Sequence, residues 1–110
     1  MLHETISRIE DQLKGSDSLE AGKKRELLSL VMELKKEVGA LAETHHEDAR
    51  SIASFTETSV HEATRGERNE ELLSHSLEGM KLSVRRFEVS HPKLVGLVNT
   101  IGRTLWEIGI

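Results

Sequence analysis

The chain has 110 residues, a formal net charge of −4 and no cysteine, which excludes disulfide bonds and thiol catalysis. The acidic balance argues against general binding to nucleic acid or to an anionic membrane surface. No apolar run approaches the ~18 residues that span a bilayer, and the first residues lack the continuous apolar segment of a secretory signal. The composition therefore predicts a single cytoplasmic domain over residues 1–110, with no nucleic-acid and no membrane partner.

Four stretches of the chain carry apolar residues at steps of four, three and four. This spacing keeps one stripe on one side of an α-helix. Each stripe lasts about two heptads, which favours a helical bundle over a true coiled coil. The predicted fold class is all-α, an antiparallel helical hairpin or bundle of three to four helices. The expected helices cover approximately residues 2–14, 19–43, 46–89 and 91–108.

The middle segment, residues 43–71, is the hardest part to interpret. It carries eight acidic and three basic side chains, and its helical register continues with small or polar residues. One interpretation is a single helix over 46–89. The other treats 43–48 and 64–70 as linkers around a short helix. The absence of proline favours the continuous helix.

The strongest boundary is the sequence Ser90-His91-Pro92. Proline is well tolerated in the first turn of a helix, and a serine before it can act as the N-cap. We therefore expect a new helix to start here, with the His91 ring bonded to Glu88 or to the end of the preceding helix. Within the new helix, two glycines at 96 and 102 either permit close approach of another helix or are merely tolerated.

The C-terminal residues 85–110 resemble the signature of a bacterial family known as domain of unknown function 4404. The matching positions are Arg86, Phe87, Glu88, Ser90, His91, Pro92, Leu94 and the terminal pair Gly109-Ile110. The likeness extends over residues 1–42 and 72–110, whereas 43–71 find little counterpart and Trp106 replaces a residue that is usually small. The resemblance implies a small helical protein with no assigned activity.

Chemistry-bearing motifs are weak. Glu43…His46 and Glu88…His91 have the Glu-x-x-His spacing of di-iron bundles, but both lie at predicted helix ends. The pairs Glu57…His61 and Glu71…His75 have surface spacing. No nucleophile with a base, no phosphate loop and no basic cluster beyond a short Lys-Lys-Arg run is present. We predict no enzyme activity, no catalytic residues, no cofactor and no metal, with a metal-binding bundle as a distant alternative.

Slender amphipathic helices of this length are expected to leave their stripes uncovered, which predicts a homo-oligomer, with a dimer first. The leading functional hypothesis is a non-enzymatic protein acting through self-association and protein–protein contacts. The alternative is a regulatory adaptor that binds a partner through a C-terminal apolar face, where Trp106 joins Val95 and Leu97. The residues expected to carry packing or the interface are Phe87, Leu94, Val98, Ile101, Leu105, Trp106 and Ile108.

Overall fold

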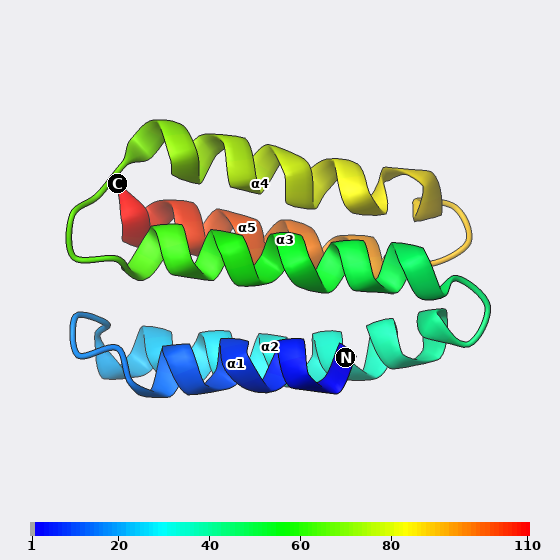
Figure 1. The fold of residues 1–110 in the computed structure, drawn as a ribbon, viewed down its shortest axis with the longest axis horizontal. Coiled ribbons are helices and arrows are strands. Elements are labelled where there is room, and N and C mark those ends of the chain that lie inside the picture. Colours follow the sequence, from blue (N-terminus) through cyan, green and yellow to red (C-terminus); the bar gives the residue numbers. More distant parts are fainter. Residues whose placement is uncertain (1) are drawn as a thin grey trace.

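The computed structural model describes residues 2–110, which form five α-helices and one short 3₁₀-helix (Figure 1). No strand occurs within this range, so the predicted all-α class is confirmed. The observed helices outnumber the three to four that were expected. Their bounds are Leu2–Lys14 for α1, Ala21–Ala42 for α2, His46–Thr64 for α3, Glu70–Val84 for α4, Arg85–Phe87 for the 3₁₀-helix η1 and Pro92–Gly109 for α5.

Helix α3 occupies the centre of the bundle. Figure 1 shows α1 and α2 on one side of α3 and α4 on the other. Helix α3 contacts each of the other four α-helices, whereas α4 contacts only α3, α5 and η1. Helix α4 is therefore an edge helix, and its outward face is covered by no other element of the described chain.

The apolar stripes converge on one core. A bundle with a radius of gyration of 12.9 Å is compact enough to cover them. Each such side chain contributes on the order of 1.5–3 kcal/mol when fully buried. The expectation that the stripes stay uncovered without a second copy is therefore wrong. The fully buried large side chains are Ile6, Ile9, Leu13, Leu27, Leu34, Leu41, Ile52, Leu73, Met80, Leu94, Ile101 and Leu105.

The continuous helix predicted over residues 46–89 is not observed. Helix α3 ends at Thr64 and α4 begins at Glu70, with an exposed polar linker between them. The side chain of Asn69 accepts a 3.0 Å hydrogen bond from the backbone N–H of Leu72 and so caps α4. Gly66 weakens helix formation in the same linker. The second interpretation, with a linker at 64–70, agrees with the structure here, while the first linker is shorter than expected because α3 begins at His46.

The small residues of α3 explain how this helix reaches the centre. Ala49, Ala53 and Ala63 are buried with at most 3% of their surface exposed. A β-carbon added to Gly109 would lie 3.2 Å from the Cα of Ala63, so α3 and α5 approach almost backbone to backbone. The small side chains of this segment therefore allow α3 to pack closely against the other four α-helices.

The start of helix α2 is capped by an acidic side chain. Glu20 itself is the N-cap, and its Oε1 accepts a 2.7 Å hydrogen bond from the N–H of Gly22. Leu19 is 8% exposed and belongs to the core. Burial of Leu19 fixes the end of the α1–α2 connection, and the neighbouring carboxylate is thereby placed at the helix start.

Candidate functional site

The corner before α5 is built differently from the prediction. Pro92 occupies the first turn of α5, as the sequence indicates, but the N-cap is His91 and not Ser90. The Ser90 hydroxyl instead lies 3.0 Å from Nδ1 of His91. The expected cap at Ser90 is wrong because the chain turns one residue later. The His91 ring consequently finds its polar partner in Ser90 and not in Glu88.

Phe87 packs against the N-cap residues of both α3 and α5. Its buried ring meets His91 and His45 edge to face, at centroid distances of 5.5 and 5.3 Å. His45 is the N-cap of α3 and has nearly the same backbone angles as His91. The Arg86 guanidinium lies 5.3 Å from the Phe87 centroid and forms a 3.3 Å ion pair with Asp48. This cluster holds the ends of three helices together, which is a structural role.

The remaining predicted packing residues face the interior of the chain. Leu94, Val98, Ile101 and Leu105 are at most 1% exposed, and Ile108 is half-buried against the same core. The terminal stripe therefore packs within one chain. Any surface for a second chain lies elsewhere.

The acidic and histidine pairs form surface and structural contacts. Arg8 donates hydrogen bonds of 2.7 and 3.2 Å to the carboxylate oxygens of Glu57, which ties α1 to α3. This hydrogen bond, with the negative charge of Glu57, raises the pKa of the Arg8 guanidinium above its ordinary value. The predicted partner of Glu57, His61, instead lies 3.8 Å from the neighbouring Glu62.

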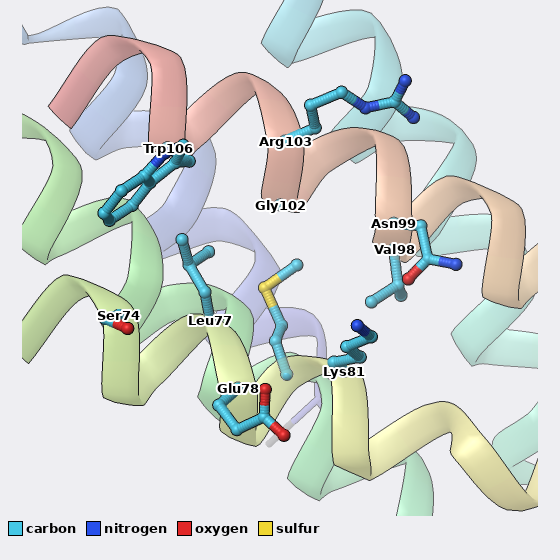
Figure 2. A pocket seen from close by; sticks show the side chains of 10 residues that line it. Ser74, Leu77, Glu78, Lys81, Val98, Asn99, Gly102, Arg103 and Trp106 are labelled. Carbon is cyan, nitrogen blue, oxygen red and sulfur yellow. The ribbon is translucent and has the colours of Figure 1, made fainter. Parts of the chain in front are cut away.

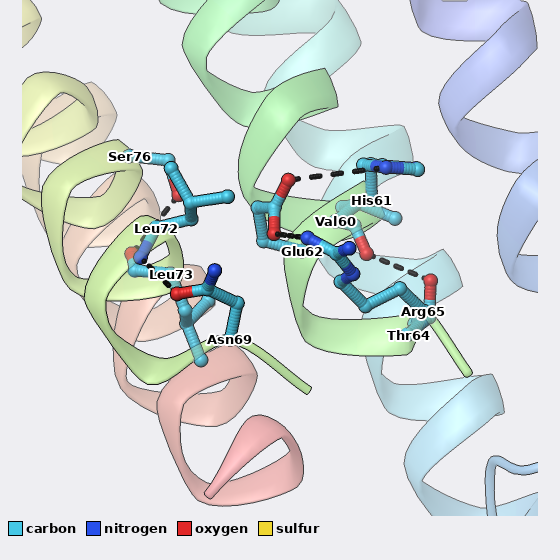
Figure 3. A network of polar contacts seen from close by, with 9 residues as sticks. All are labelled: Val60, His61, Glu62, Thr64, Arg65, Asn69, Leu72, Leu73 and Ser76. Carbon is cyan, nitrogen blue, oxygen red and sulfur yellow. Dashed lines mark hydrogen bonds and ion pairs between the residues drawn. The ribbon is translucent and has the colours of Figure 1, made fainter. Parts of the chain in front are cut away.

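Among residues 2–110, Glu62 of α3 is the carboxylate that is buried. It is 8% exposed and accepts a 2.7 Å hydrogen bond from Arg65 (Figure 3). The hydroxyl of Thr64 donates a 2.8 Å hydrogen bond to the carbonyl of Val60, one turn earlier. These contacts close the end of α3. Within residues 2–110, no group of three or more histidine, aspartate and glutamate side chains is placed to hold a metal ion, and the alternative of a metal-binding bundle gains no support.

A groove of about 470 Å³ lies between α4 and α5. Its lining is mixed, with apolar side chains along the floor and charged or polar ones at the rim (Figure 2). Ser74 and Trp106 lie at one end, and Lys81 and Asn99 at the other. The lining residues are Ser74, Leu77, Glu78, Met80, Lys81, Val98, Asn99, Gly102, Arg103 and Trp106.

Trp106 is the predicted site residue that the groove contains, at 37% exposure. The prediction that Trp106 shares an apolar face with Val95 and Leu97 was wrong. Leu97 is buried, and neither Leu97 nor Val95 lines the groove. The apolar side chains that share the groove with Trp106 come mainly from α4, with the half-buried Leu77 between Trp106 and Lys81 (Figure 2).

Gly96 and Gly102, two of the three glycines of α5, have separate explanations. A β-carbon at Gly96 would meet no atom within 4 Å, so this glycine is merely tolerated. A β-carbon at Gly102 would lie 3.8 Å from Cδ2 of Leu77, which is ordinary van der Waals contact. The missing side chain at Gly102 leaves the middle of the groove open.

Sequence reasoning missed the α4 side of the groove. Leu77 continues the apolar spacing of Leu73 and Met80, which predicts a core position, and the structure leaves it half-buried. The available signal was a second series on α4 with the same steps, Glu70, Ser74, Leu77 and Lys81. Three of these four residues are polar, so a pattern of apolar residues does not reveal the series.

The fold and the groove define a small all-α protein with a packed core and a hollow between α4 and α5. Comparison with known families matches residues 27–110 to the family described as a domain of unknown function, DUF4404, and the chain belongs to this family. The matched range includes residues 43–71 and begins within α2, so it differs from the range that the sequence resemblance covered. No curated protein and no solved structure matched the chain.

No helix among the described residues 2–110 has the length and apolar character that crossing a membrane requires.

Proposed function

We propose that this protein is a cytoplasmic, non-enzymatic protein that acts through protein–protein contacts and self-associates through the groove between α4 and α5. The observation that carries the proposal is the groove itself, where the apolar side chains of Leu77 and Trp106 lie beside a rim of opposite charges. A partially exposed tryptophan in a concave site with an apolar floor and a polar rim is typical of interface anchors. The elongated space between two helices suits a third helix.

The position of α4 supports the same proposal. Within the described chain this helix contacts only α3, α5 and η1, and the exposed side chains of Ser74, Glu78 and Lys81 leave the rim of the groove open to solvent. A helix from another chain can lie beside α4 without displacing any element of the bundle. Of the charged side chains at the rim, Glu78, Lys81 and Arg103, none has an ion-pair partner within the described chain.

A photo-crosslinking experiment on the purified protein tests the site. A benzoylphenylalanine at Ser74 places the reactive group at the exposed end of the groove, and light scattering of this variant checks that the added bulk leaves association intact. The matched control carries the same group at Ser29, an exposed position of α2. We expect illumination to give a crosslinked dimer for Ser74 only, with the link mapped by mass spectrometry to α4 or α5.

Light scattering over a concentration series measures the assembly independently. We expect a concentration-dependent dimer in the wild type and a monomer for Leu77→Glu, with Met32→Glu as the control because Met32 is 57% exposed on α2. Circular dichroism checks that each variant keeps its helices. A wild type that stays monomeric at several hundred micromolar would contradict self-association.

The second candidate, a regulatory adaptor, uses the same groove for a helix of a different protein. Trp106 favours it, because exposed aromatic anchors serve heterologous interfaces equally well. The crosslinking result separates the two candidates. The adaptor would be favoured if two results hold together. The purified protein stays monomeric, and in cells the benzoylphenylalanine at Ser74 crosslinks to one defined protein, a link that Trp106→Asp abolishes.

A further inference from the structure

The side of α4 that borders the groove carries a pattern of its own. Glu70, Ser74, Leu77 and Lys81 follow one another at steps of four, three and four, so they form one ridge along the helix. Glu70, Ser74 and Lys81 are exposed and Leu77 is half-buried. An acidic residue stands at one end of this ridge and a basic residue at the other, with a small and a large side chain between them.

Two copies of this ridge are complementary in charge and side-chain size when the helices run antiparallel. In an antiparallel pair of identical helices related by a two-fold axis, residue i faces residue j and residue j faces residue i. If the axis passes between Ser74 and Leu77, each Glu70 faces the partner's Lys81, and each Ser74 faces the partner's Leu77. A parallel pair would instead bring like charges together at both ends, which disfavours association.

We infer that the occupant of the groove is α4 of a second copy of this chain, packed antiparallel to α4 across a two-fold axis between Ser74 and Leu77. This inference rests on the proposed function and specifies its partner and geometry. Helices α4 and α5 of the two copies then form a four-helix arrangement at the interface.

The charges support this partner. Neither Glu70 nor Lys81 has an ion pair within the described residues of its own chain. The antiparallel arrangement gives both a partner, twice per dimer. Charge pairs of this kind determine orientation and exclude the wrong register more than they add affinity.

The shape of the groove supports it as well. Ser74 lies at the same end of the groove as Trp106, on the opposite wall (Figure 2). A large side chain placed against Ser74 therefore also reaches the face of Trp106. In the antiparallel dimer this side chain is the partner's Leu77, so each tryptophan gains an apolar contact that one chain alone leaves open.

A charge-reversal cycle tests the geometry. We expect Glu70→Lys and Lys81→Glu each to weaken dimerisation about tenfold or more, because each places like charges together at both ends of the interface. The double variant Glu70→Lys/Lys81→Glu restores opposite charges and should return the dimer dissociation constant to within about threefold of the wild type. The matched control is the reversal Glu33→Lys/Lys36→Glu on the exposed surface of α2. Sedimentation velocity supplies the dissociation constants.

Helix stability does not confound this cycle. Lysine at position 70 is unfavourable in the first turn of α4 whether or not residue 81 is also reversed. Restoration by the double variant therefore reports the contact between chains. Equal weakening in the single and double variants would overturn the antiparallel geometry. If Leu77→Glu still abolishes the dimer in that case, the groove remains the interface and only the orientation is wrong. If Leu77→Glu has no effect either, the proposed function fails as well.

Discussion

The ring of Phe55 in α3 lies directly against the Cα of Gly79 in α4. A β-carbon at position 79 would overlap ring atoms Cε1 and Cδ1 of Phe55. The register of α3 on α4 therefore depends on a missing side chain facing an aromatic one. Phe55 keeps 40% of its surface exposed in this position, so it covers the seam between the helices from outside.

Whether Gly79→Ala lowers or raises the stability of the fold should depend on which residue occupies position 55. In the wild type we expect Gly79→Ala to destabilise the fold, because displacement of the Phe55 ring outweighs the gain in helix propensity. In the Phe55→Ala background the same change should stabilise by about 1 kcal/mol, since only the propensity remains. Urea unfolding of the four proteins measures both effects. Equal effects in the two backgrounds would show that the ring and the glycine are not coupled.

Two glycines of α5 should respond in opposite directions. Gly96→Ala should stabilise by about 0.5–1 kcal/mol, because the added methyl group meets open space. Gly109→Ala should destabilise, because the methyl group would meet Leu73 and the backbone of Ala63. Thermal melts of both variants check the contrast. Stabilisation of both would mean that α3 and α5 do not approach as closely as the structure places them.

The hydroxyl of Ser59 should be dispensable. Its Oγ is the side-chain polar atom that, among the described residues, is buried without a hydrogen-bond partner. Ser59→Ala removes this unsatisfied group and is expected to stabilise the protein by about 1 kcal/mol. Ser76→Ala is the control, since Ser76 is also buried but donates a 2.9 Å hydrogen bond to the carbonyl of Leu73. A loss of stability for Ser59→Ala would reveal a partner for this hydroxyl in solution.

Adjacent residues of α5 should separate folding from association. Leu105 is fully buried, so Leu105→Asp places an unpaired charge in the core and should unfold the chain. Trp106 faces the groove, so Trp106→Asp should keep the helical circular dichroism signal and shift the proposed dimer towards monomer. Size-exclusion chromatography with light scattering distinguishes the outcomes. Loss of helicity in both variants would place Trp106 in the core rather than at a surface.

Apolar periodicity was enough to locate the helices whose stripes are strong. The first helix lies at Leu2–Lys14 and the last at Pro92–Gly109, close to the ranges expected from the sequence. The break between α3 and α4 could not be decided in the same way. It depends on a side-chain cap at Asn69 and on an exposed linker, and neither disturbs the helical register of the flanking residues.

The candidate site was predictable only in part. The sequence predicted Trp106 as part of an apolar face, and the groove does contain it. The opposite wall was hidden, because Leu77 fits both the buried series of α4 and the ridge from Glu70 to Lys81. The pairing of two helices decides which series faces the core, and this pairing depends on contacts between distant parts of the chain.

The central place of α3 has a consequence for the order in which the protein opens. Because α3 contacts every other α-helix, we expect most of its amide hydrogens to exchange through openings that separate several helices at once. Helix α4 borders solvent along one side, and its amides should exchange through smaller, local openings. The segment with the weakest apolar pattern in the sequence should thus be the last to lose its protection, and a second chain bound in the groove, as proposed above, would slow exchange in α4.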